Sequence, residues 1–194
     1  MRVTGWCSTI AVLVLTLTHS NATAQQRSID VAKSTLTVRV YKAGVFSAFA
    51  HDHEIVAPIA GGRADTTARH VDLQVDSAKL RVNDPKGSEG DRAQIQKTML
   101  GPEVLDSERY PKIEFRSTAA EPNDADSWTV RGTLTLHGQT APVTVQVTER
   151  AGHFTGSSAF RLTEFSIKPV RIAGGTVKVK DEVRIEFDIQ LARH

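Results

Sequence analysis

Residues 175–191 alternate between apolar and polar side chains almost without interruption. From Val177 onward the odd positions hold valine, isoleucine, phenylalanine or leucine, and the even positions are charged or polar. A period of two is typical of a β-strand with one dry face and one wet face. Asp181 breaks the apolar row once, which predicts a turn or a bulge between two strands. One strand cannot bury such a row alone, so the chain needs a sheet curved around a shared interior.

The same alternation returns elsewhere in the chain and predicts an all-β fold. It covers residues 36–40, 71–75, 128–136 and 143–147. One-sided strands separated by turn signals favour an antiparallel sandwich or barrel. The sequence His137-Gly138-Gln139-Thr140 joins two of these segments and predicts a hairpin. A mixed α/β fold is disfavoured because no long helical patterns separate the strands.

One segment departs from the strand pattern and predicts a short helix near the middle of the chain. Between residues 89 and 100, one side of such a helix would carry Arg92, Ile95, Gln96 and Met99. Gly101-Pro102 would end it. We expect this helix to cap one end of a barrel.

The first residues have the pattern of a secretory signal peptide. Arg2 is followed by an apolar run over residues 10–17, and Ala22-Thr23-Ala24 offers small residues to a signal peptidase. We therefore expect a signal peptide over residues 1–24 and a single domain over residues 25–194. The alternative is an uncleaved membrane anchor, but the apolar run is shorter than the ~20 residues that span a bilayer.

Composition excludes several classes of function. Cleavage would remove Cys7, the only cysteine, and with it all disulfide and thiol chemistry. The net charge of +2 and the lack of a basic run argue against a nucleic-acid-binding protein. No catalytic constellation is evident, so we expect a protein that is not an enzyme. A barrel enzyme acting on a lipid head group remains the third hypothesis, after lipid binding and metal binding.

Separated motifs in a fixed order resemble the YceI-like family. The sequence Leu-Asp-Ser-Glu-Arg-Tyr-Pro-Lys-Ile-Glu-Phe-Arg-Ser-Thr over residues 105–118 resembles one signature of that family. The sequence Gly-Thr-Leu-Thr-Leu-His-Gly-Gln-Thr-Ala-Pro-Val over residues 132–143 resembles a second. An early Asp30-x-x-x-Ser34 start, the segment Gly44-Val45-Phe46 and the final strands also fit. The resemblance covers about residues 28–191.

The resemblance implies a lipocalin-like antiparallel β-barrel exported to the periplasm. Family members bind a long isoprenoid chain, such as the tail of a quinone or polyprenyl lipid, inside the barrel. We therefore expect a periplasmic binding or carrier protein whose partner is an amphipathic isoprenoid lipid. We predict no stable membrane span, and the sequence allows a homodimer. The residues expected to contact the ligand are Phe46, Phe49, His51, His53, Ile95, Met99, Phe115 and Phe187.

The sequence Phe49-Ala50-His51-Asp52-His53-Glu54-Ile55 carries the main alternative. On a strand, His51 and His53 would point to the same face, where imidazole nitrogens can bind zinc, copper or nickel. A third ligand would come from His70, His153, His137 or Glu54. Two other interpretations stay open: the histidines bond loop backbone or line the barrel mouth, or they contact a ligand head group.

The remaining expectations concern packing. Ile185 and Phe187 are expected core positions, and Trp128 is expected to pack in the core or at a barrel end. His137 is expected to brace the hairpin turn in which it lies. His153 follows a glycine at a strand start and shows no partner in the sequence.

Overall fold

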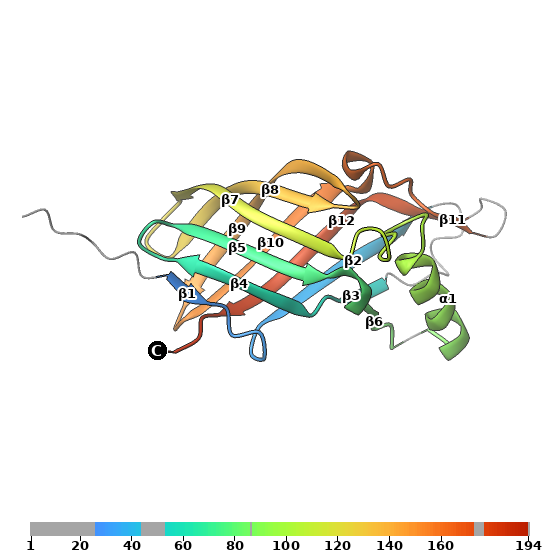
Figure 1. Cartoon of the computed structure of the whole chain (residues 1–194), viewed down its shortest axis with the longest axis horizontal. Helices are drawn as coiled ribbons and strands as arrows, with labels where there is room; N and C mark the ends of the chain where they lie inside the picture. The colour runs from blue at the N-terminus through green and yellow to red at the C-terminus, as the bar shows by residue number, and fades with distance from the viewer. Residues whose placement is uncertain (1–25, 44–52, 86, 173–176, 194) are drawn as a thin grey trace, which may run out of the picture.

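The described part of the chain forms one antiparallel sheet that curls strongly around an interior, with one α-helix at one end (Figure 1). The computed structural model describes residues 26–43, 53–85, 87–172 and 177–193. The strands are β1 Gln26–Ser28, β2 Thr35–Ala43, β3 His53–Val56, β4 Ile59–Asp65, β5 His70–Asp76, β6 Arg81–Val82, β7 Lys112–Pro122, β8 Ser127–Leu136, β9 Gln139–Arg150, β10 His153–Arg161, β11 Arg171–Ile172 and β12 Val177–Gln190. Their order is β1-β4-β5-β7-β8-β9-β10-β12-β2-β3-β6, with β11 beside β12. The predicted antiparallel barrel-type fold is confirmed.

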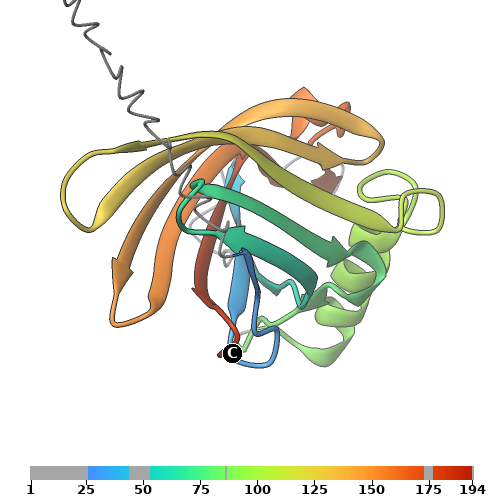
Figure 2. The same ribbon diagram turned by 60° about the vertical axis from the view of Figure 1, so that its left-hand side comes forward.

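A short strip of backbone over residues 28–30 joins two strands that lie far apart in this order. On one side, the Ile29 amide donates to the Gly62 carbonyl of β4 over 3.0 Å. On the other, the Asp30 amide donates to the Gln190 carbonyl of β12 and the Ala192 amide donates to the Ser28 carbonyl, both over 2.8 Å. Figure 2 shows the resulting curl of the sheet. The strip thus closes the sheet at the end away from the helix.

The early Asp30-x-x-x-Ser34 motif holds this strip in place. The Gln190 amide donates to the Ser34 hydroxyl over 3.0 Å. The Asp30 carboxylate accepts a hydrogen bond from the Lys33 ammonium over 3.0 Å, and this bond lowers the pKa of Asp30. The motif therefore shapes the turn between β1 and β2 and ties it to the end of β12.

Asp181 marks a bulge within β12. The pairing of β12 with β2 shifts between Val179 and Val183, while the strand itself continues through the irregularity. The Asp181 carboxylate accepts from the Thr163 amide over 2.9 Å and from its hydroxyl over 2.7 Å. Of the two predicted possibilities, the bulge is the one found, and it fixes the 3₁₀ helix Leu162–Phe165 against the sheet.

The β8–β9 hairpin turns at His137 and Gly138, whose φ angles are +51° and +71°. Positive φ at both central residues suits the twist of a two-residue hairpin. A Cβ atom on Gly138 would lie 2.4 Å from the Tyr110 ring, so the turn requires glycine there. The His137 ring meets Tyr110 edge-on at 5.0 Å, and its Nδ1 lies 3.3 Å from the Phe165 carbonyl. The prediction that His137 braces the turn is confirmed.

The helix α1, Glu89–Leu100, has the predicted bounds. The Ser88 hydroxyl caps its first turn by accepting from the Asp91 amide, and Gly101 ends it. Met99 is buried on the face toward the sheet. Gln96 anchors the same face, because its amide accepts from the Val82 backbone over 2.9 Å and donates to the Leu80 carbonyl over 2.8 Å.

The best-packed part of the interior lies near the α1 end, where Phe165 and Ile167 are almost fully buried. Phe165 meets the Phe160 ring edge-on at 5.2 Å. Ile185 and Phe187 face the interior as expected, and Phe187 packs against a buried cluster, but neither side chain is fully buried. Both line a cavity, so part of each side chain faces open space rather than packed neighbours.

This difference predicts unequal costs for two Phe→Ala substitutions. Phe165→Ala removes a fully buried ring, and we expect a loss of about 3–5 kcal/mol in the free energy of unfolding. Phe187→Ala removes a ring that already borders a cavity, so its loss in ligand-free protein is expected to be smaller. Urea denaturation of both variants measures the difference. Equal losses would contradict the assignment of Phe187 to a cavity wall.

Candidate functional site

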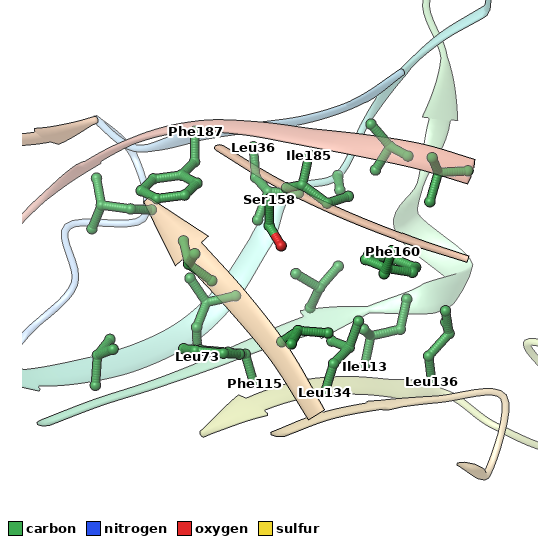
Figure 3. Close-up of a pocket in the computed structure, with 18 of the residues that line it drawn as sticks. Leu36, Leu73, Ile113, Phe115, Leu134, Leu136, Ser158, Phe160, Ile185 and Phe187 are labelled. Carbon is green, nitrogen blue, oxygen red and sulfur yellow. The ribbon is translucent and has the colours of Figure 1, made fainter. Parts of the chain in front are cut away.

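The inward faces of the strands enclose a cavity of about 970 Å³, near the top of the roughly 300–1,000 Å³ range of small-molecule sites. Its wall extends from α1 at one end to the β4–β5 and β9–β10 turns at the other. Figure 3 shows side chains from opposite walls pointing into this space. The apolar wall includes Leu36, Val38, Ile55, Leu73, Val75, Ile95, Met99, Ile113, Phe115, Trp128, Leu134, Val145, Phe154, Phe160, Ile185 and Phe187.

The structure brings together every predicted ligand-contact residue that it describes. Ile95 and Met99 reach the cavity from α1, Phe115 from β7, Phe187 from β12 and His53 from β3. The other three, Phe46, Phe49 and His51, lie outside the described residues. Trp128, which we expected to pack in the core or at a barrel end, also lines the cavity.

One hydroxyl group in this wall forms its hydrogen bond within the sheet rather than toward the cavity. Ser158 lies among the apolar side chains on β10 (Figure 3), and its hydroxyl donates to the Thr144 carbonyl of the neighbouring strand over 2.8 Å. The cavity therefore keeps its apolar character at this point.

His53 and Asp84 form a buried polar pair at the α1 end of the cavity. The His53 Nδ1 lies 3.0 Å from the Asp84 carboxylate, and the two side chains are 7% and 5% exposed. His53 lines the cavity, and Asp84 follows β6 on the chain segment that leads to α1. Sequence reasoning missed Asp84, whose only local signal is that it precedes a proline and so suits a turn.

Side-chain contacts on the outer face of the sheet fix the orientation of β3, in which His53 points inward. Glu54, the next residue, points outward and pairs with Arg39 over 3.1 Å. Arg39 also binds Glu186 over 2.8 Å, and this hydrogen bond raises the pKa of the guanidinium. The Asn83 side-chain amide donates to Glu54 over 2.8 Å. These contacts tie β3 to β2, to β12 and to the segment that carries Asp84.

Comparison with known proteins assigns this architecture to a family. Residues 27–191 match the YceI-like domain. The chain belongs to the YceI-like family. Its fold is similar to that of BcnA from Burkholderia cenocepacia, with a TM-score of 0.62 and 21% identity over 85% of this chain and 99% of that one. A YceI protein from Campylobacter jejuni gives a TM-score of 0.51 and 12% identity over 64% of this chain and 73% of that one.

Two curated relatives are UPF0312 proteins. The one from Pseudomonas savastanoi pv. phaseolicola is 30% identical over 116 residues, which are 54% of this chain and 56% of that protein. The one from Shewanella oneidensis is 28% identical over 139 residues, which are 66% of this chain and 65% of that protein. The chain therefore spans between half and two thirds of these relatives' length.

The first family signature, residues 105–118, connects two strands of the cavity wall through hydrogen bonds. Its Tyr110 carbonyl accepts from the Ser77 hydroxyl over 2.8 Å, and its Pro111 carbonyl accepts from the Ser77 amide over 3.0 Å. Ser77 is fully buried beside the end of β5. The Tyr110-Pro111 motif of this YceI-like chain thus joins β7 to β5, while Phe115 in the same signature faces the cavity.

The proposed third metal ligands have other partners. His70 lies 3.3 Å from Asp72 and 3.2 Å from the Ser117 hydroxyl, and His137 lies in the hairpin turn. His153, for which the sequence showed no partner, lies 3.0 Å from Asp188 on the adjacent strand. Within residues 26–43, 53–85, 87–172 and 177–193, no three histidine or acidic side chains are grouped as a metal site. His51 lies outside these residues.

The family match begins just after the predicted signal peptide, and residues 1–24 lie outside the described part of the chain. Within the described part, no helix has the length and apolar character needed to cross a membrane.

Two His–Asp pairs in this chain provide a matched stability test. Asp84→Ala leaves the buried His53 ring without its carboxylate, and we expect a loss of about 1–3 kcal/mol in the free energy of unfolding. Asp188→Ala breaks the His153 pair, whose side chains are 44% and 39% exposed, so water replaces the lost contact. Its expected cost is about 0–1 kcal/mol. Urea denaturation compares the two, and an equal cost would show that burial of the His53 pair does not matter.

Proposed function

We propose that this protein is a periplasmic carrier that holds one long-chain isoprenoid lipid, of polyprenyl or quinone type, in its interior. The observation that carries the proposal is the largely apolar cavity of about 970 Å³ that runs inside the curled sheet. The YceI-like family is associated with isoprenoid binding, which supports this class of ligand. The predicted signal peptide supports the periplasmic location.

The chemistry of the wall suits a hydrocarbon chain. Removing apolar groups from water contributes about 0.8 kcal/mol per CH₂, so a long chain gains affinity along the whole length of the cavity. The side chains that the lipid would contact, such as Leu73, Phe115 and Phe187, come from different strands and already face the open space. Binding of this kind needs no acid, base or nucleophile.

The head group is proposed to lie at the α1 end, near the His53–Asp84 pair. His53 brings an imidazole to this end of the cavity, and the polar side chains of Gln94 and Thr98 on α1 line the same end. An imidazole and an amide can each form hydrogen bonds with the oxygens of a quinone or an alcohol. Phe46, Phe49 and His51, which the sequence also predicts as ligand contacts, lie outside the described residues.

Lipid extraction tests the proposal directly. Protein purified from its own periplasm is expected to release a long-chain isoprenoid into organic solvent, identified by mass spectrometry. Delipidated protein is expected to melt at a higher temperature when a polyprenol or a prenyl quinone is added. The proposal fails if pure protein yields no lipid and no added isoprenoid shifts the melting temperature. One bound transition metal per chain, without lipid, would favour the His51/His53 alternative instead.

A charge placed inside the cavity should abolish lipid binding. Val145 of β9 lines the cavity, and a glutamate there would have to lose its water to contact hydrocarbon. Val145→Glu is therefore expected to release no isoprenoid on extraction. Thr144→Glu is the control, because Thr144 is the preceding residue on the same strand and is exposed. Circular dichroism checks that both variants keep their strands, and lipid retained by Val145→Glu would contradict the proposed site.

A further inference from the structure

Two phenylalanine rings enter the cavity from opposite walls, and each lies over a glycine of the neighbouring strand. Phe187 of β12 is paired in register with Gly156 of β10. A Cβ atom on Gly156 would lie 2.6 Å from Cζ of the Phe187 ring, well inside contact distance. Figure 3 shows Phe187 on the upper wall and Phe115 on the lower wall of the same space. The Phe187 ring therefore occupies the volume that a side chain at position 156 would fill.

The second pair repeats this arrangement. Phe115 of β7 lies diagonally from Gly132 of β8, since Ser117 is the in-register partner of Gly132. A Cβ atom on Gly132 would lie 2.6 Å from Cε2 of the Phe115 ring. The ring therefore rests against the bare backbone of the adjacent strand, as Phe187 does on the other wall.

These pairs determine how far each ring projects into the cavity. A ring that rests on glycine lies back against the wall, whereas any side chain beneath it would push it toward the opposite wall. Both rings remain half-buried, so each still exposes surface to the cavity. The positions of these two rings, and of the glycines that support them, thus contribute to the free width between the two walls.

We propose that Phe115, Phe187, Gly132 and Gly156 form a width filter, which admits one flexible chain and excludes a rigid fused-ring lipid. The inference rests on the proposed lipid-binding function and restricts the ligands to lipids with a flexible chain. An isoprenoid chain can rotate about its single bonds and pass between the two rings. A sterol is a rigid plate that cannot bend around them, so it would have to displace a ring from its place over glycine.

The test uses the phenylalanines, because the glycines also support the fold. A Cβ atom on Gly156 would lie 2.0 Å from the Gln146 carbonyl oxygen, and one on Gly132 would lie 2.4 Å from that of Arg116. Substituting either glycine would therefore disturb the backbone of the sheet. Removing both rings with Phe115→Ala/Phe187→Ala widens the cavity without adding an atom.

Delipidated wild-type protein and the double variant are each mixed with geranylgeraniol or with cholesterol, and bound lipid is measured by native mass spectrometry. Wild-type protein is expected to bind geranylgeraniol and at least about tenfold less cholesterol. The double variant is expected to bind both. Circular dichroism checks that the double variant keeps its strands, because a partly unfolded chain also exposes apolar surface that can bind a sterol. Phe115→Leu/Phe187→Leu, which keeps larger apolar side chains, guards against poor folding of the alanine variant and is expected to show a smaller gain.

The control is Phe160→Ala, since Phe160 lines the same cavity but packs edge-on against Phe165. We expect no gain of cholesterol binding in this variant. The filter is wrong if wild-type protein takes up cholesterol as readily as geranylgeraniol, if both double variants still reject it, or if Phe160→Ala gains it equally. In these cases chain binding by the wild type leaves the carrier function intact. Wild-type protein that binds neither lipid overturns both proposals.

Discussion

The backbone bonds of residues 28–30 are the contact on which the enclosed interior depends. A curled antiparallel sheet exposes unpaired amides and carbonyls wherever its two ends fail to meet. Here the strip bonds to β4 through Gly62 and to the end of β12 through Gln190, beyond the last residue that β12 pairs with β2, so one short segment joins the β1–β4 edge of the sheet to β12. Arg27 strengthens the contact, because its guanidinium donates to the Ala192 carbonyl over 2.9 Å. Without this closure the apolar faces of β4 and β12 would open to water.

Closure around a wide curve has a second consequence, because the side chains do not fill the space they enclose. Near α1, Phe165 and Ile167 pack densely with residues from several elements. Farther along, Ile185 and Phe187 border empty volume and remain half-buried. Leaving apolar surface unpacked costs stability. A bound hydrocarbon would restore those contacts, which is the physical reason to connect this fold with a lipid rather than with a soluble polar ligand.

Polar side chains lie at particular places along the cavity and separate a polar α1 end from an apolar middle. The His53–Asp84 pair marks the α1 end, while Ser158 is bonded into the wall and leaves the middle apolar. The outward contacts of Glu54 with Arg39 and Asn83 hold the strand and loop that carry the buried pair. A head group at one end and a chain in the middle would match this division, and the two phenylalanine–glycine pairs would then act on the chain.

Local sequence determined the elements and their faces. The period of two in residues 175–191 requires a strand with one dry face, and glycine at the β8–β9 turn and Gly101-Pro102 after α1 set element boundaries that the structure confirms. These features depend on neighbours a few residues apart, so the sequence by itself decided them. The radius of the curl, the pairing of His53 with a residue 31 positions away and the hollow beside Phe187 were decided only by the tertiary structure. Alternation says which side chains face inward, but how much space lies between opposite walls depends on how all the strands close together.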